Sequence, residues 1–547
     1  MQLTKPPPPL FLDLLKNATV LVVDDYQGMR TMLRNVVKEM GIARVDTANS
    51  GKDALNLLSQ GKYDLVLCDY NLGPGQNGQQ VLEEARLNKY IGLACIWIMV
   101  SAEKSSEMVL GAVEVKPDDY LFKPINQAML ETRLQRLVTR KKVMAEIGAA
   151  VEEENYLKAI ALCDERLQEG NTQPQELLRI KSQLLMTIGA FDGAQAVFET
   201  VLKERNVPWA RVGMGKVQFA ARDYASARMT FESVLEENRM YMEAADWLAR
   251  TLDAMGEGEQ AQKVLEDAAR RSPNSAARQK SLAETAYRNG ALDVAQMAFE
   301  KTIKVSEFSS HKNPAAFTGL AKVLSDQENP ERALRVLDQS RKEFANNPEA
   351  AIQMAAAESV VYKNMGDTAK AEAAMAVAEQ VMSQLEGKVS AEVAMDMAKS
   401  YFKLEKKDRA AELLGNVIKN NHENVELSRQ VEGIFEREQM GEAGQELIEK
   451  ARQEVFGINN EGVRLANAGK LKEGVELLRK AVHELPTNQV IILNLAGLLI
   501  AQMSREGKDN AIAAEVRMLI DQAIRINAAN KKIHEYSAVL DRLMKGA

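Results

Sequence analysis

Residues 20–25 read VLVVDD, an apolar run that ends in two acids. A nearly all-apolar strand is typical of a parallel sheet whose two faces are both covered. Similar short runs follow, separated by amphipathic helical patterns. The strands are expected at residues 19–23, 44–47, 64–68, 96–100 and 119–122, and the helices near 28–40, 51–60, 78–88, 104–113 and 126–139. This alternation predicts a doubly wound, flavodoxin-like α/β domain with its ligand site at the carboxyl ends of the strands.

After about residue 142 the strand signal ends and a longer period begins. Behind a Gly-type turn comes an aromatic residue or Leu, and three positions later a small residue, as in Phe191 and Ala194. The small residue recurs at 159, 194, 227, 261, 295, 333, 371, 410 and 474. A bulky apolar residue stands four positions after most of them: Phe198, Phe231, Leu265, Phe299, Leu337, Met375, Leu414 and Leu478. The last interval is about twice the others, so it suits two units, one of them degenerate around 425–452.

A period near 34 residues with this pattern resembles the tetratricopeptide repeat (TPR), over roughly residues 145–485. The physical reason is that a helix pair cannot bury its own apolar face. The small residue lets neighbouring helices approach, and the bulky one fills the groove between them. Residues 486–547 are expected to form a degenerate last unit and capping helices. An irregular helical bundle is the alternative.

The composition points to a protein of the cytoplasm. The formal net charge of −7 argues against a general nucleic-acid binder, which needs a basic face. The three cysteines have neither disulfide nor metal-ligand spacing and suit a reducing compartment. Residues 1–16 lack the features of a signal peptide, and no stretch reaches the ~18 uninterrupted apolar residues of a membrane span.

Polar residues stand at the ends of the expected strands. Asp24 and Asp25 follow the first, Asp69 the third, Ser101 the fourth and Lys123 the fifth. If the strands are parallel, these side chains converge at one edge of the sheet. Each is weak as a signal by itself, but their joint occurrence in this order is specific.

Four stretches, VLVVDD (20–25), LVLCDYNL (65–72), IMVSAE (98–103) and DYLFKP (119–124), resemble the receiver domain of two-component response regulators. The resemblance covers about residues 17–140. It implies that Asp69 accepts a phosphoryl group and that Asp24, Asp25 and Asp69, with the main-chain carbonyl of Asn71, hold Mg²⁺. It further implies that Ser101 holds a phosphoryl oxygen, that Lys123 pairs with the phosphate, and that Tyr120 is the switch aromatic.

Elementary electrostatics explains these residue types. Carboxylates ~4 Å apart repel by around 4 kcal/mol per pair at an effective dielectric constant near 20. Mg²⁺ prefers oxygen ligands and relieves this repulsion, while a lysine offsets charge on the transferring group. Lys116, also followed by proline, competes for the lysine role. Lys123 is preferred because it directly follows an apolar strand, and Lys116 is expected to be solvated.

The sequence also leads to several more detailed expectations. The loop NLGPGQNG (71–78) is a residue longer than the commonest family form, so the following helix is expected to start slightly displaced. Asn71 and Glu103 occupy positions that tune phosphoryl lifetime in the family. The four histidines (His311, His422, His483 and His534) are expected at the surface or in a groove, and the basic run 140–142 on a solvated helix face.

The repeats are expected to bind a protein partner on the face lined by the first helix of each pair. Trp209, Lys216, Phe219, Arg250 and Tyr287 fall at such positions. The favoured hypothesis is an adaptor that is switched by phosphorylation of Asp69 from the phosphohistidine of a sensor histidine kinase or phosphotransfer protein. The alternative is a phosphate sink that competes with another regulator for the kinase.

An effector enzyme or a transcription factor is disfavoured, because residues 145–547 offer repeats in place of a catalytic or DNA-binding domain. The only chemistry expected is the receiver's own phosphorylation and dephosphorylation, with no nucleic-acid or membrane partner. Homodimerisation through the receiver, by residues 104–139, remains open.

Overall fold

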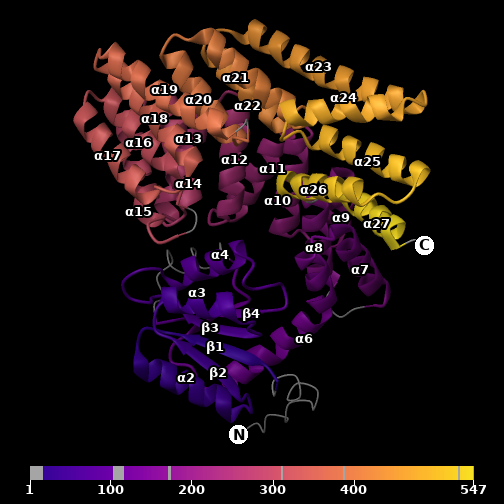
Figure 1. Ribbon diagram of the computed structural model, residues 1–547. Coiled ribbons are helices and arrows are strands. Elements are labelled where there is room, and N and C mark those ends of the chain that lie inside the picture. Colours follow the sequence, from indigo (N-terminus) through magenta and orange to yellow (C-terminus); the bar gives the residue numbers. More distant parts are fainter. Residues whose placement is uncertain are drawn as a thin grey trace. The chain divides into compact units, whose positions relative to one another are not determined.

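The structure, a computed structural model, describes residues 17–102, 116–170, 174–309, 312–385, 388–527 and 530–545 (Figure 1). The chain divides into two units, Met1–Lys312 and Asn313–Ala547. The first unit holds a β-sheet followed by helix pairs, and the described part of the second holds helices alone. The predicted fold class, an α/β domain followed by a helical array, is confirmed.

Five parallel strands form the sheet, in the order β2-β1-β3-β4-β5. They are β1 (Thr19–Val23), β2 (Arg44–Ala48), β3 (Leu65–Asp69), β4 (Ile96–Ser101) and β5 (Asp119–Phe122). The order reverses at β1, whose neighbours are β2 and β3. All the strands end at the same edge, as expected for parallel neighbours, and the crevice at such a reversal is where open α/β sheets bind ligands.

Helices cover both faces of the sheet. The described ones are α2 (Gln27–Glu39), α3 (Gly51–Gln60), α4 (Gly78–Leu87) and α6 (Gln127–Glu152). Val20 and Val22 of β1 pack in the cluster of α2 and α6, whereas Leu21 and Val23 pack in the cluster of α3 and α4. This alternation explains why β1 is apolar throughout. The helix expected at 104–113 lies outside the described residues.

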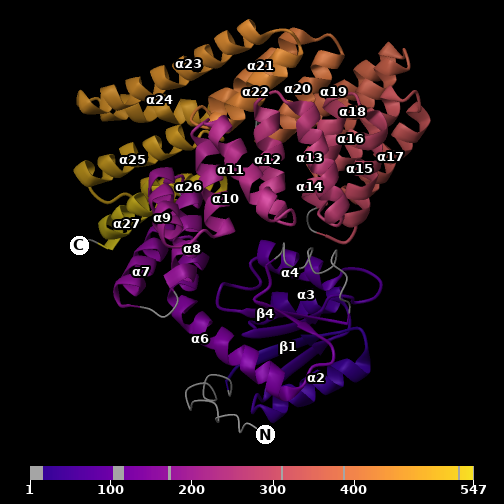
Figure 2. The same cartoon turned by 180° about the vertical axis from the view of Figure 1, so that it is seen from behind.

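Helix α6 is longer than the sequence pattern indicated. Asn126 caps its start by accepting a hydrogen bond from the N–H of Met129, and the helix continues past the expected end at 139 to Glu152 (Figure 2). No proline interrupts it. The sheet and the first repeat are therefore joined by one continuous helix.

The remaining helices continue the array, in which α6 and α7 form the first pair. In the first unit they are α7 (Tyr156–Gln168), α8 (Pro174–Thr187), α9 (Phe191–Glu204), α10 (Pro208–Ala220), α11 (Tyr224–Glu237), α12 (Met242–Ala254), α13 (Gly258–Arg271), α14 (Ala276–Arg288) and α15 (Leu292–Val305). In the second they are α16 (Pro314–Asp326), α17 (Pro330–Glu343), α18 (Pro348–Asn364), α19 (Thr368–Gln384), α20 (Ala391–Lys403), α21 (Lys407–Asn420), α22 (Val425–Arg437), α23 (Gly441–Asn467), α24 (Leu471–Glu484), α25 (Gln489–Glu506), α26 (Asn510–Asn527) and α27 (Lys531–Lys545).

The small residues of the sequence period share one structural position. Each is the fourth residue of its helix and is buried: Ala159, Ala194, Ala227, Ala261, Ala295, Ala333, Ala371, Ala410 and Gly474. The bulky residues four positions on are buried as well, with Phe231, Leu337, Met375, Leu414 and Leu478 fully so. Two residues before each of these helices the backbone has positive φ, at Glu154, Gly189, Arg222, Gly256, Gly290, Glu328, Gly366, Glu405 and Gly469.

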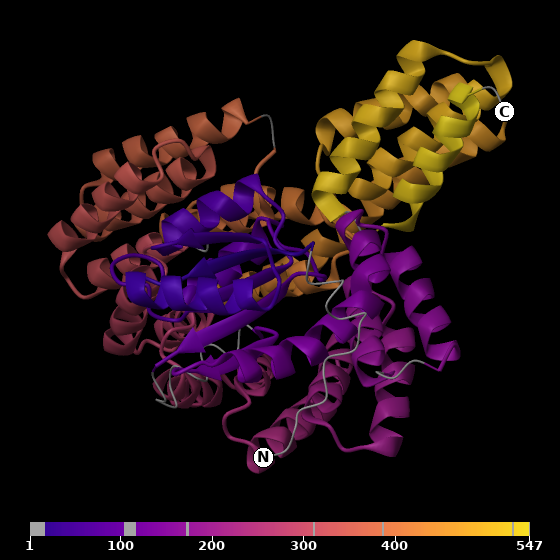
Figure 3. The same ribbon diagram turned by 90° about the horizontal axis from the view of Figure 1, so that it is seen from below.

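The degenerate unit follows the same rule. Gly444, in the expected interval, is the fourth residue of α23, lies against Phe435, and is followed at the bulky position by buried Ile448. Helix α23 is 27 residues long and is not interrupted by a turn. The loss of a turn explains why the next small residue, Gly474, comes early. The last helices, α25 to α27, pack together around a shared apolar cluster (Figure 3).

Candidate functional site

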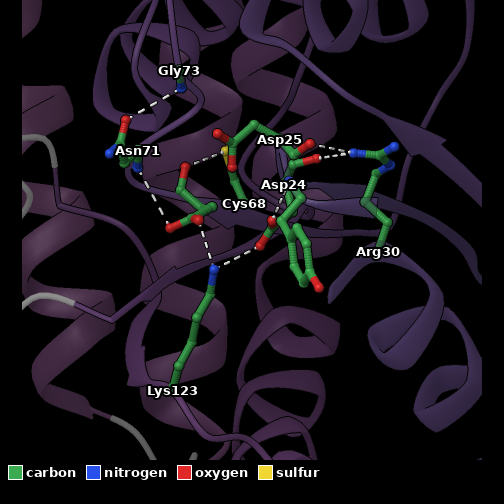
Figure 4. Close-up of polar contacts among 9 residues, drawn as sticks. Asp24, Asp25, Arg30, Cys68, Asn71, Gly73 and Lys123 are labelled. Atoms are coloured by element: carbon green, nitrogen blue, oxygen red, sulfur yellow. Dashed lines mark hydrogen bonds and ion pairs between the residues drawn. The ribbon is translucent and has the colours of Figure 1, made fainter. Parts of the chain in front are cut away.

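Four of the residues predicted to converge lie together at the carboxyl edge of the sheet: Asp24, Asp25, Asp69 and Lys123 (Figure 4). Asp24 and Asp25 directly follow β1, and Asp69 ends β3. Carboxylate oxygens from the three residues lie within 4.8 Å of one another. The side chains of Asp24 and Asp69 are only 1% and 9% exposed, whereas Asp25 is exposed. The cluster thus has a buried base and one open side.

Lys123 reaches this cluster from the segment after β5. Its Nζ donates to Asp24 Oδ2 at 2.7 Å and to Asp69 Oδ2 at 2.6 Å (Figure 4). Its side chain is 14% exposed, and the peptide bond to Pro124 is cis. Lys116, the competing candidate, pairs with Glu243 instead and is 48% exposed. Of the two lysines, it is Lys123 that contacts the acids.

The cluster alters the ionisation of its members. Burial raises the pKa of Asp69 above its ordinary value, while hydrogen bonds and charge from Lys123 act against this shift. Burial would lower the pKa of Lys123, but its bonds to Asp24 and Asp69 outweigh burial and raise that pKa. The ammonium charge is therefore held at the site.

The donor set fits a hard divalent cation. Three carboxylates offer oxygen ligands from neighbouring positions, and oxygen ligands are what Mg²⁺ prefers. Lys123 compensates only part of their negative charge, since one ammonium faces three acids. Among the described residues, no other group of three or more His, Cys, Asp or Glu side chains brings its ligand atoms this close together.

The other predicted site residues lie on strands β4 and β5 or just after β3. The Asn71 N–H donates to Asp69 Oδ1 at 3.4 Å, and its side-chain oxygen accepts from Gly73. Ser101 is the last residue of β4 and is 2% exposed. Tyr120, on β5, packs its ring 5.1 Å from that of Phe122. Glu103 lies outside the described residues.

Two features of the site were missed by sequence reasoning. Arg30 of α2 donates from Nη1 to the carbonyl oxygens of Asp24 and Asp25, at 2.6 and 2.9 Å, and so holds the acidic turn (Figure 4). Gly78 lies so close to Asp69 that a Cβ there would be 2.1 Å from the Asp69 carbonyl oxygen. A basic residue within two turns of the acid pair, and a glycine at the start of a helix, were the available signals.

The loop between Asp69 and α4 ends in a capping box. The Asn77 side chain accepts from the N–H of Gln80, and the Gln80 side chain accepts from the N–H of Asn77. Helix α4 begins at Gly78, the position expected from the sequence pattern. The Gly78 N–H also donates to the Tyr70 carbonyl at 2.8 Å. The start of α4 is thereby tied to the strand that carries Asp69.

The predicted groove residues divide into two groups. Lys216, Phe219 and Arg250 form one cluster with Trp247, in which Arg250 lies 4.8 Å from the Trp247 ring and Lys216 lies 5.2 Å from it. Phe219 is buried, 5.4 Å from the same ring. Trp209 packs separately against Phe198, and Tyr287 is half-buried on α14.

Other sequence signals have different outcomes. His422 is 5% exposed and bonds to Asn488, so the expectation of a surface or groove position was wrong for it. His483 is exposed, as expected, whereas His311 and the side chains of His534, Arg140 and Lys142 lie outside the described part of the chain. Within the described ranges, no helix is long and apolar enough to cross a bilayer.

Comparisons with known proteins match two segments of the chain. A family model of the response regulator receiver domain matches residues 20–135, and a tetratricopeptide repeat model matches residues 218–285. The chain is 30% identical over 125 residues to the chemotaxis protein CheY-3 of Vibrio cholerae, covering 23% of this chain and 95% of that protein. It is 26% identical over 121 residues to the chemotaxis protein CheY of Pseudomonas aeruginosa, covering 22% and 96%. The crystal structure of CheY4 of Vibrio cholerae is 28% identical, with a TM-score of 0.21, and covers 22% of this chain and 98% of that one.

Proposed function

Since the chain belongs to the response regulators, with a receiver domain followed by tetratricopeptide repeats, we propose that it is a phosphorylation-controlled adaptor of two-component signalling. In this proposal Asp69 accepts a phosphoryl group from a phosphohistidine, and its state controls protein binding by the repeats. The observation that carries the proposal is the meeting of Asp24, Asp25, Asp69 and Lys123 at one sheet edge.

The chemistry assigned to Asp69 is nucleophilic substitution at phosphorus. A carboxylate oxygen of Asp69 forms a new bond to phosphorus, while the bond between phosphorus and the donor's imidazole nitrogen breaks. The nitrogen keeps the electron pair and is protonated by solvent. The product is an acyl phosphate, which water hydrolyses to restore the carboxylate.

Lys123 is assigned to charge compensation during this transfer. Its ammonium already contacts Asp69 Oδ2, so it lies where negative charge arrives with the phosphoryl oxygens. A Mg²⁺ ion, when bound by Asp24, Asp25, Asp69 and the Asn71 carbonyl, would supply further positive charge there. Arg30 keeps the Asp24–Asp25 turn in place through two backbone carbonyls.

Ser101 and Tyr120 are assigned to reading the state of Asp69. Ser101 ends β4, which pairs with β3, the strand that carries Asp69. Tyr120 of β5 lies in register with Met99 of β4. In this assignment the Ser101 hydroxyl moves to donate to a phosphoryl oxygen, and the ring of Tyr120 follows into the space left.

Phosphorylation with a small donor tests the proposal directly. Purified chain incubated with acetyl phosphate and Mg²⁺ is expected to gain one acid-stable, base-labile phosphoryl group, detected by intact mass. Asp69→Asn should abolish the gain, whereas Asn56→Asp, which creates a new carboxylate at an exposed position of α3, should not increase it. Labelling that persists in Asp69→Asn would refute the assignment.

Partner binding tests the adaptor role. Proteins retained by the full chain from its native cells should differ between the acetyl phosphate-treated chain and Asp69→Asn. If the retained set is identical while the chain lowers phosphorylation of a second regulator, the phosphate-sink alternative replaces the adaptor.

A further inference from the structure

Glu243, in the first turn of α12, is shared by two lysines from different domains. Lys216 of α10 donates to its Oε1 at 2.7 Å, and Lys116 of the receiver domain donates to its Oε2 at 3.2 Å. All three residues belong to the first unit of the chain. Lys116 therefore has a partner on the repeats, and the expectation that it is only solvated is incomplete.

A second contact joins the same two domains. Gln80 of α4 donates from its side-chain nitrogen to the carbonyl oxygen of Val305, the last residue of α15, at 2.9 Å. The last carbonyls of a helix lack partners within the helix, so this hydrogen bond satisfies one of them. The other end of the same amide accepts from the Asn77 N–H, in the capping box at the start of α4.

Helix α4 connects both contacts to the phosphorylation site. Arg86, near its end, donates to the carbonyl oxygen of Lys116 at 2.9 Å and so holds the backbone of the contacting lysine. At its start, Gly78 packs directly against the Asp69 carbonyl. Asp69 and the start of α4 are therefore in direct contact, and α4 carries Gln80 and supports Lys116.

The charge of Glu243 explains why a lysine of the receiver domain binds to it. Burial would raise the pKa of Glu243, but the charges of Lys216 and Lys116 outweigh burial and lower it. Glu243 thus presents a carboxylate whose one oxygen is held by the repeats and whose other oxygen is open to a cation from outside them. Its side chain and that of Lys116 are 35% and 48% exposed, so the pair is weak and sensitive to salt.

We propose that the face of α12 around Glu243 is a docking site for the chain's own receiver domain, with Lys116 as the ligand and Gln80 as a second anchor. Phosphorylation of Asp69 releases this contact, a step that rests on the proposed function. The docked Lys116 shares Glu243 with Lys216, a residue of the Trp247 cluster on the face predicted to bind a partner. Docking and partner binding then exclude one another.

A charge exchange in the full chain tests the docking. Spin labels on Ser59→Cys of α3 and Met229→Cys of α11 would report the distance between the domains by pulsed electron resonance. Both positions are exposed, whereas the three native cysteines are buried. Lys116→Glu or Glu243→Lys should reduce the docked population relative to the open one about five-fold, as expected for loss of an exposed ion pair.

The double variant Lys116→Glu, Glu243→Lys should recover part of the docked population that Glu243→Lys loses, because opposite charges again face each other between the domains. Recovery stays partial, since Lys216 no longer has its carboxylate partner. Glu236→Lys, an equal charge change at an exposed site on α11, should leave the distance distribution unchanged. If neither single variant changes the distribution, or if the double variant is no more docked than Glu243→Lys alone, the docking site is wrong.

Treatment with acetyl phosphate and Mg²⁺ tests the release. The distance distribution should shift to the open form in the original chain and stay docked in Asp69→Asn. If intact mass shows that Asp69 is phosphorylated while the distribution is unchanged, release by phosphorylation is overturned. If Asp69 is never phosphorylated, the proposed function fails, and the charge exchange alone decides whether the receiver docks.

Discussion

The receiver domain and the repeats bury different kinds of side chain. At the carboxyl edge of the sheet the buried residues include Asp24, Asp69 and Ser101. An apolar residue would suit such a buried position better for packing alone, because burying a polar group costs free energy. In the repeats the buried positions that define the period are alanines and large apolar residues. Buried acids point to chemistry at one place, whereas the repeated alanines point to a scaffold. The two regions should therefore respond differently to substitution.

The largest difference should appear when the two Lys-Pro lysines are compared. Lys123→Met removes the ammonium that contacts Asp24 and Asp69, and phosphoryl transfer from acetyl phosphate should slow about 10²- to 10³-fold, as for removal of one donor from a charge-stabilising site. Lys116→Met should leave the rate within about two-fold, because Lys116 contacts Glu243 and none of the acids. Equal losses in both variants would erase the distinction between a chemical and a docking lysine.

Replacing a glycine by alanine should have opposite effects on stability in the two regions. In Gly78→Ala the new methyl group meets the Asp69 carbonyl, and a clash with backbone should destabilise the receiver domain by up to about 3 kcal/mol. In Gly457→Ala, within α23, the methyl group meets nothing within 4 Å, and the better helix propensity should stabilise that helix by about 1 kcal/mol. Hydrogen exchange followed by mass spectrometry separates the two regions, since a multidomain chain has no single unfolding free energy.

Within the repeats, equivalent turns allow a smaller comparison. Gly290 and Glu328 both precede a helix by two residues, with φ of 76° and 60°. Gly290→Ala should destabilise its turn by about 1 kcal/mol, and Glu328→Gly should relieve strain of similar size. Protection of the amides in α15 and α17 would report the two effects. The same sign in both variants would show that backbone strain does not govern these turns.

The smallest expected effect concerns pH and lies in the second unit. Burial lowers the pKa of His422, whose Nδ1 lies 3.1 Å from the side-chain nitrogen of Asn488. The unfolded chain takes up the proton first, at a pH near 6.5, so the contribution to stability is full above that pH. It is lost as the pH falls through the lower pKa of the folded state.

Amide exchange in α21 and α25 should therefore be more protected at pH 8 than at pH 5, after correction for the intrinsic rate. In His422→Gln, which cannot titrate, this difference should shrink. A pH dependence that is the same in both proteins would assign it to other groups.

Sequence reasoning placed every described strand within one residue, because apolar runs between polar ends leave little freedom. The alternation of strands and helices also predicted that Asp24, Asp25 and Lys123 would lie close to Asp69, since parallel strands bring their carboxyl ends to one edge. The positions of the repeats followed from one small residue per unit. Gly444 was missed, although glycine satisfies the same steric requirement and takes the equivalent position at 474.

What sequence reasoning could not supply were contacts between distant segments. Arg30 bonds to backbone carbonyls, which have no sequence signature. The pairing of Lys116 with Glu243 joins residues 127 positions apart on two domains, and neither has a periodicity that points to the other. The burial of His422 likewise depends on Asn488, 66 residues later.

Helix α6 has a consequence for how the receiver domain would return to α12 after release. As a single helix of 26 residues it spans roughly 39 Å, and a helix of this kind bends only slightly along its length. The first half of α6 packs in the receiver core, so a receiver detached from α12 would stay joined to the repeats by the stiff second half, in contrast to a domain on a flexible linker. Its local concentration near Glu243 would stay high, so re-attachment after loss of the phosphoryl group should be an intramolecular step that does not depend on protein concentration.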